Sequence, residues 1–306
     1  MKKVLILTDK KGWHFQQLKQ SLIKNDIPVE SINISKLIIA TDSKNTKILR
    51  EDDSEVNVSD VIVRYIPGGS LEEIVTYLNI LRVFKNQGVN VINTAESIET
   101  TVDKSLTSII LKNNNILTPK TWIIRGKNKS IEFAQELLKK HVLIYKPLFG
   151  SQGDNIKKIN KPSDIKNINN PSNVYYLQEF ISIEPNHDYR VLIIKNKNKK
   201  FSYSMARYGN SFVNNFSKGG KCVSIPFNKE IINTAFKSAE ALNIPFCGVD
   251  LIKKDNLVYV IEANSIPAWK GIQTTTNDIV SDKIVEIFIK SKDIKKNFVV
   301  KNKFKC

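Results

Sequence analysis

Three oxygen-bearing side chains near the C-terminal end are spaced so that a β-hairpin would bring them together. Residues 248–264 contain two apolar runs rich in β-branched residues, separated by a polar turn. Glu262 and Asn264 are two residues apart and share one face of a strand, and a loop centred on Asn256 places Asp250 opposite Glu262. Two carboxylates and an amide, with no His or Cys, suit Mg²⁺ bound to nucleotide phosphates. The alternative is a surface hairpin with solvated acids.

A second candidate is a glycine-containing loop between two predicted strands, at residues 146–155. Gly150 and Gly153 allow the backbone to approach a phosphate closely, and Lys146 stands just before the loop, where it can neutralise phosphate charge. The loop lacks the GxxxxGKS or GxxxxGKT pattern of a Walker A motif. Taken alone, the segment is more simply interpreted as an ordinary glycine hairpin.

Charged and polar residues between these two features complete the candidates. Asp188 and Arg190 are two residues apart and share a strand face, so Arg190 could pair with Asp188 or could stabilise a phosphoryl group in transfer. Asn215 lies in a polar loop that ends in two glycines and could reach a metal ion or a phosphate, or could be a turn residue. No Ser-His-Asp or Cys-His arrangement is evident, which argues against a protein nucleophile.

The elements that must position these residues indicate an α/β protein of several units. Residues 1–99 alternate between strand and helix in a βαβ pattern, which predicts a parallel sheet covered by helices. Residues 100–181 form a second unit with the glycine loop, and residues 182–290 form a third with the carboxylate hairpin. Residues 291–306 are a basic tail.

Two local predictions within these units can be compared with the structure. The spacing of apolar residues predicts one helix over residues 100–113. Residues 42–57 are polar and are expected to form an exposed loop.

Composition limits the function classes. The 306 residues carry a formal charge of +17, but six arginines against 41 lysines, spread from end to end, indicate compositional drift more than a nucleic-acid-binding patch. A ribosome- or nucleic-acid-associated basic protein is therefore kept only as an alternative. Three scattered cysteines indicate a reducing compartment, so we expect a cytoplasmic protein, and three scattered histidines argue against zinc. No apolar stretch is long enough for a membrane span, and no membrane partner is expected.

In this order, the segments resemble the ATP-grasp superfamily and, within it, the RimK-type carboxylate–amine (alpha-L-glutamate) ligases. The resemblance runs from about Asp103 to Ile289, over more than half of the chain. It rests on the following segments: Asp103-Lys104, Lys146 to Gly153, Gln178 to Ile181, Asp188 to Arg190, Asn215 with Gly219-Gly220, Gly248 to Asp250, and Glu262 to Asn264. It implies an ATP-grasp fold, in which residues 1–99 are a pre-ATP-grasp domain and two α+β lobes enclose ATP.

The resemblance also implies a role for each matching residue. The phosphates of ATP would be bound by Lys104 and Lys146, under a lid that contains Gly150, Ser151 and Gly153. The backbone of Glu179 and Phe180 would bind adenine, and Asp188 and Asn215 would line the nucleotide pocket. Two Mg²⁺ or Mn²⁺ ions would be held by Asp250, Glu262 and Asn264, and Arg190 would stabilise the transferred phosphoryl group.

The reaction implied is amide formation driven by ATP. A substrate carboxylate attacks the γ-phosphate to give an acyl phosphate and ADP, and an amine, such as that of glutamate, then displaces phosphate. The partners implied are a small-molecule carboxylate and an amino acid, and the family makes a homo-oligomer an expectation. A nucleotide-binding module without catalysis is the remaining alternative.

The chain departs from the family pattern where an acidic amino acid would bind. Val213 stands where many relatives have Arg, and Arg207 stands alone where they often have a pair, which leaves glutamate specificity open. Arg207 and Lys270 are the residues expected to meet the second substrate. Residues 265–273, with 68–72 and 101–105, look most like a subgroup linked to tetrahydromethanopterin one-carbon metabolism, which implies a pterin-type carboxylate over a ribosomal protein tail.

Overall fold

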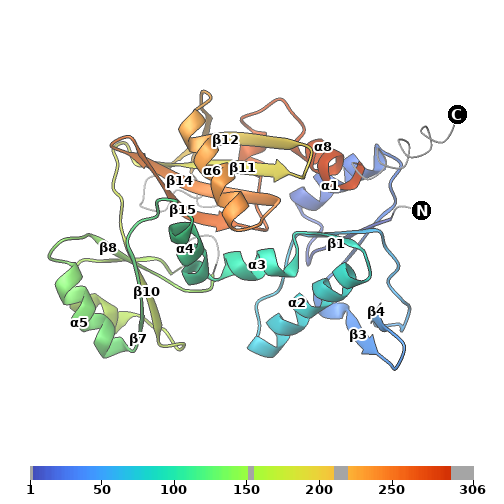
Figure 1. Cartoon of the computed structure of the whole chain (residues 1–306), viewed down its shortest axis with the longest axis horizontal. Coiled ribbons are helices and arrows are strands. Elements are labelled where there is room, and N and C mark those ends of the chain that lie inside the picture. The colour runs from blue at the N-terminus through green and yellow to red at the C-terminus, as the bar shows by residue number, and fades with distance from the viewer. Residues whose placement is uncertain (1–2, 151–154, 210–219, 291–306) are drawn as a thin grey trace, which may run out of the picture.

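The computed structural model describes residues 3–150, 155–209 and 220–290. Three sheets and a two-stranded ribbon make up the β-structure, and helices lie against them or between them (Figure 1). Within these ranges, no helix has both the length and the apolar character needed to cross a membrane.

The first sheet is parallel and has the strand order β2-β1-β5-β6. Its strands are β1 (Val4–Leu7), β2 (Val29–Ile32), β5 (Asp60–Val63) and β6 (Asn90–Ile92). Helix α1 (Trp13–Ile23) connects β1 to β2, and α2 (Leu71–Asn86) connects β5 to β6. A capping box, in which Ser70 and Glu73 each accept the other's backbone N–H, begins α2. This sheet is the predicted βαβ arrangement.

The segment expected to be a polar loop, 42–57, is partly strand. Strand β3 (Ile38–Thr41) follows a short 3-10 helix (Ile34–Lys36) and pairs antiparallel with β4 (Thr46–Leu49). The loop prediction was therefore wrong for β4. Its single buried apolar residue, Ile48, anchors the ribbon to the core, and one such residue gives little periodic signal.

The second sheet is antiparallel, with the order β7-β10-β8-β9. Its strands are β7 (Thr121–Arg125), β8 (Leu143–Lys146), β9 (Lys157–Ile159) and β10 (Val174–Glu179). Helix α5 (Lys127–Leu137) and a 3-10 helix (Pro162–Asn167) cover one face of it. Tyr175, Leu177 and Ala134 are among the residues that fill the core between sheet and helices.

Two helices occupy the region for which one was predicted. They are α3 (Ala95–Val102) and α4 (Lys104–Asn113), and Asp103 separates them. Asp103 has an extended backbone, and its carboxylate accepts the N–H groups of Ser105 and Leu106 at 2.8 and 3.1 Å. The single helix was therefore wrong, because Asp103 acts as the N-cap of a new helix.

The third sheet is antiparallel, with the order β13-β12-β11-β14-β15. Its strands are β11 (His187–Lys195), β12 (Lys200–Tyr208), β13 (Lys221–Ser224), β14 (Phe246–Lys254) and β15 (Leu257–Asn264). Helix α6 (Lys229–Ala241) packs on one face against Val191 and Val249. The opposite face carries Leu192 and Met205 at one end and charged residues at the other.

The last elements join the third sheet to the first. Helices α7 (Lys270–Gln273) and α8 (Val280–Val285) precede a π-helical turn (Glu286–Lys290), and α8 lies beside α1 (Figure 1). Phe15 and Leu18 of α1 share one core with Leu192, Trp269 and Ile284. The two units are therefore held together by common apolar packing.

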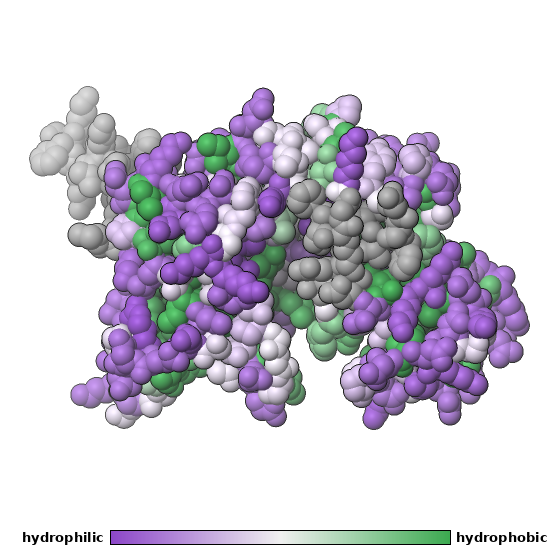
Figure 2. Space-filling model, turned by 180° about the vertical axis from the view of Figure 1, so that it is seen from behind, coloured by the Kyte–Doolittle hydropathy of each residue, from purple (hydrophilic) through white to green (hydrophobic). Residues whose placement is uncertain are grey.

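The outer surface agrees with the lysine-rich composition. The face shown in Figure 2 is largely hydrophilic, and it is hollowed between the N-terminal unit and the unit that carries α5. Apolar side chains are visible at this hollow (Figure 2).

Candidate active site

The hairpin of β14 and β15 brings the predicted carboxylates together. Asp250 pairs with Glu262, and Gly248 with Asn264, in the register that the spacing predicts. The turn is a two-residue loop, Asp255 and Asn256, both with positive φ, a conformation that these residue types tolerate.

A β-bulge gives the hairpin its final register. Leu251 pairs with Val260 while Asp250 pairs with Glu262, so Ile261 is an extra residue on β15. Val258 and Val260 belong to the core under α6, and so does Ala263 beyond the bulge. The bulge therefore changes the alternation, and Glu262 and Asn264 face away from that core.

Two arginines bind Asp250 from neighbouring strands. Arg190 on β11 donates from Nε and Nη2 to the two oxygens of Asp250, at 2.7 and 2.6 Å. Arg207 on β12 donates from Nη2 to Asp250 Oδ2 at 2.9 Å, and from Nε and Nη2 to the oxygens of Asp188 at 2.6 and 2.8 Å. The order Asp188, Arg207, Asp250, Arg190 thus alternates in charge across three strands.

The protonation of this cluster follows from burial and pairing. Burial alone would raise the pKa of Asp250, but Arg190 and Arg207 hold that pKa below its ordinary value. Burial raises the pKa of Asp188, and Arg207 opposes the shift. Burial also disfavours the charge of Arg207, but the two carboxylates raise its pKa above the ordinary value. Asp250 is therefore ionised and rigidly held.

The donor set fits a hard divalent cation. Asp250 Oδ1 accepts one hydrogen bond from Arg190, which leaves it able to bind a second partner. Glu262 and Asn264 add a carboxylate and an amide oxygen on the same face. Among the described residues, no group of three or more His, Cys, Asp or Glu side chains gathers to hold a metal. A metal here would complete its shell with water or phosphate, as Mg²⁺ commonly does.

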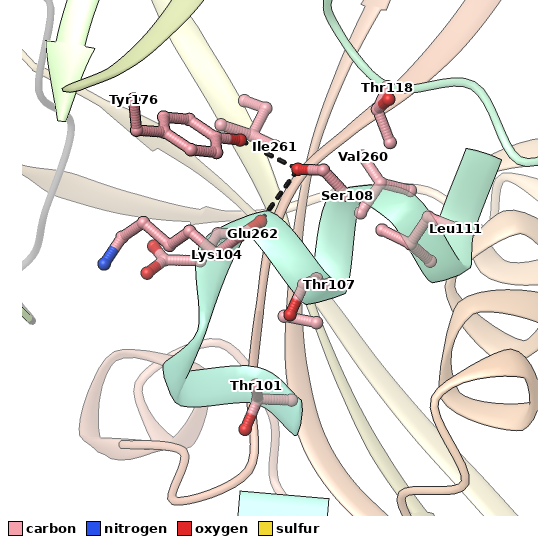
Figure 3. A pocket seen from close by; sticks show the side chains of 11 residues that line it. Thr101, Lys104, Thr107, Ser108, Leu111, Thr118, Tyr176, Val260, Ile261 and Glu262 are labelled. Carbon is pink, nitrogen blue, oxygen red and sulfur yellow. Dashed lines mark hydrogen bonds between the residues drawn. The ribbon is translucent and has the colours of Figure 1, made fainter. Parts of the chain in front are cut away.

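Two lysines are close enough to Glu262 for its charge to act on them. Lys146, at the end of β8, is buried and donates to Gln178 Oε1 at 2.6 Å. Burial lowers its pKa to about 8, and Glu262 opposes this shift. Lys104 opens α4 and points toward Glu262 (Figure 3). Burial lowers the pKa of Lys104 as well, again opposed by Glu262. A buried cation with a lowered pKa is well placed to bind an anion.

Lys104 also contacts the start of the glycine loop. Its Nζ donates to the carbonyl oxygens of Gly150 at 2.9 Å and Leu148 at 3.4 Å. Gly150 has a φ of +149°, a conformation that residues with side chains rarely adopt. Gly150 therefore lies beside Lys104, as the predicted phosphate site requires.

A small pocket lies behind Glu262, between the helix pair α3 and α4 and strand β15 (Figure 3). Ser108 and Tyr176 meet across it through their hydroxyl groups at 2.8 Å. The residues that line it are Thr101, Lys104, Thr107, Ser108, Leu111, Thr118, Tyr176, Val260, Ile261, Glu262 and Ala263.

The predicted adenine-reading residues lie at the end of β10. The backbone N–H of Glu179 donates to Lys120, and that of Phe180 donates to Val142, both at 2.8 Å. Glu179 Oε1 also lies 3.0 Å from His141 Nδ1. The sheet therefore uses both backbone donors, and adenine would have to be read by other groups of this segment.

Of the remaining predicted site residues, two lie within the described ranges and three do not. Arg207 is only 2% exposed and links two carboxylates, so it is not positioned as an open substrate contact. Lys270 is exposed at the start of α7. Ser151, Gly153 and Asn215 lie outside the described residues.

Sequence reasoning missed two contributors. Gln178 stands in a segment that carries the family resemblance but has no predicted role there, and the structure makes it the buried hydrogen-bond partner of Lys146. Arg64 was not singled out, although it is half-buried beside Trp269, with its guanidinium carbon 4.7 Å from the ring centre and its Nε and Nη1 atoms shielded from solvent. The available signal was an arginine in a chain whose basic residues are nearly all lysine.

Comparison with protein families decides the relationship. The model of the RimK-like ATP-grasp domain matches residues 101–288. The chain belongs to the RimK-like ATP-grasp family. The tetrahydromethanopterin:alpha-L-glutamate ligase of Methanocaldococcus jannaschii is 30% identical to it over 215 residues, covering 67% of this chain and 72% of the relative. The ligase of the same name from Methanococcus maripaludis is 25% identical over 287 residues, covering 92% and 96%.

Solved structures agree on the fold. The RimK domain ATP-grasp protein of Sphaerobacter thermophilus has a TM-score of 0.71 at 14% identity, covering 94% of this RimK-like chain and 99% of its own. The ATP-grasp ligase PsnB, complexed with minimal precursor, Mg and ADP, has a TM-score of 0.69 at 13% identity, covering 95% and 98%. The protein has the ATP-grasp fold and is an ADP-forming carboxylate–amine ligase that uses ATP and Mg²⁺.

Proposed function

We propose that this RimK-like ligase joins the amino group of L-glutamate to a small-molecule carboxylate of the pterin type. Two relatives are named tetrahydromethanopterin:alpha-L-glutamate ligase, and this chain matches 72% and 96% of their lengths. The observation that carries the proposal is the cluster of charges at the hairpin of β14 and β15, in which Arg190 and Arg207 contact Asp250, while Glu262 acts electrostatically on Lys146 and Lys104. Such a site suits phosphoryl transfer to a carboxylate.

Each residue has a proposed task. Lys146 and Lys104 bind the phosphates of ATP, since both are cations that burial has left short of counter-charge. Asp250, Glu262 and Asn264 hold two Mg²⁺ ions, which neutralise charge on the phosphate oxygens when bound. Arg190 is held in place by Asp250 and directs its guanidinium at the phosphoryl group in transfer.

The proposed reaction has two displacements. A carboxylate oxygen of the acceptor attacks the γ-phosphorus, the bond to the β-γ bridging oxygen breaks, and ADP leaves. The amino nitrogen of glutamate then attacks the acyl carbon and phosphate leaves with the acceptor's oxygen. The protein's contribution is positioning and charge stabilisation, because no covalent intermediate with the enzyme is needed.

Two further expectations remain proposals. A cytoplasmic location agrees with Cys222 and Cys247, which are both unpaired. A homo-oligomer is proposed by analogy with the family. The buried charge cluster favours catalysis over either alternative, because a basic scaffold protein or a purely nucleotide-binding module would have no use for Arg190 locked onto Asp250.

The test is ADP release with ATP, Mg²⁺ and L-glutamate against a panel of pterin and simple carboxylates. The proposal predicts release that needs both glutamate and one class of carboxylate, and loss of that release in Glu262→Gln. Turnover with a different amino acid would reject glutamate, and turnover with a peptide terminus alone would reject the small-molecule acceptor.

A further inference from the structure

Arg64 lies at a topological switch point of the first sheet. It follows β5 directly, and its backbone N–H and that of Tyr65 both donate to Leu7 O at the end of β1, at 2.9 and 3.1 Å. The order β2-β1-β5-β6 means that the chain leaves β1 toward β2 on one side, while β5 lies on the other. Open parallel sheets bind ligands outside the carboxyl ends of strands at such a point.

The guanidinium of Arg64 is not matched by any acid among the described residues. Its Nε and Nη1 atoms are buried and have no hydrogen-bond partner there. Burial lowers the pKa of Arg64 to about 10, and no described carboxylate offsets that shift. By contrast, each of the arginines Arg50, Arg82, Arg190 and Arg207 contacts a carboxylate.

The groups around Arg64 add positive charge or stay neutral. Trp269 presents its ring to the guanidinium, and its backbone N–H donates to His14 Nε2 at 3.1 Å. Burial, followed by the charges of Arg64 and Lys270, lowers the pKa of His14 to about 3, so the imidazole is neutral. A cation whose donors are shielded from solvent and unpaired is costly, and the part of the chain that the structure describes offers Arg64 no counter-ion. The arrangement is that of an anion site.

The segment that covers Arg64 begins at the catalytic centre. It starts after Asn264, the last residue of β15. Its Pro267 packs closely on Gly248: a Cβ added at Gly248 would lie 3.3 Å from Pro267 and 3.6 Å from Arg190 Nε. Two residues later, Trp269 packs on Arg64. The segment therefore connects the proposed phosphoryl-transfer site to the switch point of the first sheet.

We propose that Arg64 binds a carboxylate of the incoming amino acid, one that takes no part in the reaction. The fork of an arginine suits a carboxylate, which would satisfy the orphaned donors and supply the missing charge. The proposed ATP phosphates have Lys146 and Lys104 of their own, so the substrate is the remaining source of an anion. This inference rests on the proposed function for the identity of the amino acid.

The test uses Arg64→Met, Arg64→Lys and the matched control Arg82→Met, which removes an exposed arginine on α2. L-Glutamate binding is measured by tryptophan fluorescence, since Trp269 contacts Arg64, and ATP binding is measured separately by calorimetry. We expect Arg64→Met to weaken L-glutamate binding by at least about 30-fold, because truncating one partner of a buried charge pair has an effect of this size. Arg64→Lys should recover only part of it, and ATP affinity should not change.

A thermal melt separates binding from a structural role. Because Nε and Nη1 of Arg64 have no partner among the described residues, Arg64→Met should melt at the wild-type temperature or above it. If Arg64 had a structural role, the same substitution would lower the melting temperature. Unchanged L-glutamate binding in Arg64→Met, or an equal loss in Arg82→Met, would overturn the proposal. So would a loss of ATP affinity in Arg64→Met alone, which would assign the arginine to phosphate. L-Glutamate binding through Arg64 in wild-type protein that releases no ADP with glutamate and any acceptor of the carboxylate panel would reject the proposed reaction and leave the site standing.

Discussion

At the scale of single residues, the site uses its two kinds of cation differently. Arg190 and Arg207 are locked into ion pairs by rigid forks and hold Asp250 ionised. Lys146 is a compact charge whose pKa burial has lowered to about 8. Arginine keeps its charge at any physiological pH, whereas a buried lysine titrates in the working range and responds to a bound anion.

The pH dependence of nucleotide binding follows from Lys146. Phosphate binding favours the protonated amine, so ATP affinity should be constant below pH about 8 and fall above it, approaching about tenfold per pH unit. Calorimetric titrations across this range should show the fall in wild type and not in Lys146→Met, whose affinity should be lower throughout. A fall of the same steepness in Lys146→Met would assign it to another group.

The stability of the unliganded protein should change with pH in the opposite direction. The unfolded lysine, with a pKa near 10.5, binds its proton more tightly than the folded one, so the free energy of unfolding should rise between pH about 8 and 10.5. Lys146→Met should lack this rise.

Substitutions at Asp250 and Glu262 should separate an effect on stability from an effect on metal affinity. Asp250→Ala leaves Arg190 and Arg207 without their shared partner and should lower the free energy of unfolding by about 3–5 kcal/mol. Glu262→Gln keeps the shape and breaks no such pair, so urea unfolding should be close to wild type while Mn²⁺ affinity, followed by electron paramagnetic resonance, falls at least about tenfold. Wild-type Mn²⁺ affinity in Glu262→Gln would remove this residue from the metal site.

The residue-scale predictions succeeded where the chemistry is local. The pairing of Asp250 with Glu262 was predicted from a loop centred on Asn256. The turn is instead the pair Asp255 and Asn256, and the bulge at Ile261, which the spacing alone did not indicate, restores the predicted pairing.

The contact of Arg190 with Asp250 could not be predicted, because it depends on the register between β11 and β14, which lie far apart in the chain. The contact of Arg207 with Asp188 crosses the adjacent strands β11 and β12, and the spacing of the sequence did not indicate their register. Spacing alone suggested that Arg190 might pair with its near neighbour Asp188.

At the scale of elements, the break between α3 and α4 has a functional result. Asp103 caps α4, and Lys104 is the first residue of that helix, so the cap fixes the position from which the lysine reaches Gly150 and lies beside Glu262. A sequence with good helical periodicity through residues 100–113 conceals this break, because a capping aspartate also occurs within surface positions of longer helices.

Removal of this cap should affect both stability and binding. Asp103→Ala should lower the free energy of unfolding by about 1 kcal/mol and should weaken ATP binding severalfold. Ser70→Ala is the matched control, because it removes the N-cap of α2 at a similar cost and lies in the first unit. If both variants lose stability equally and neither changes ATP affinity, the cap does not position Lys104.

At the scale of the whole molecule, the first and third units share a core and a buried hydrogen-bond junction. Asn93, fully buried, donates to the carbonyl oxygens of Phe246, at 2.6 Å, and of Ser265, and it accepts from Phe246 N at 3.3 Å. The sequence indicated the separate units through their periodicity. It could not indicate this junction, because a lone asparagine after a short strand is most simply a turn residue.

Asn93→Ala should therefore destabilise the molecule as a whole. Loss of these bonds leaves buried backbone groups unpaired and should lower the free energy of unfolding by about 2–4 kcal/mol in urea. Asn79→Ala, on the exposed side of α2, should change it by less than about 0.5 kcal/mol. Equal effects of the two substitutions would mean that the junction contributes little.

The central claim is that an acyl phosphate links the two substrates, and transfer of oxygen from the acceptor to phosphate tests it most directly. The acceptor is labelled with heavy oxygen in its carboxylate, and the released phosphate is analysed by mass spectrometry after turnover with ATP, Mg²⁺ and L-glutamate. We predict one labelled oxygen in each phosphate, and no substrate-dependent release of phosphate from Glu262→Gln. Amide product accompanied by unlabelled phosphate would contradict the account.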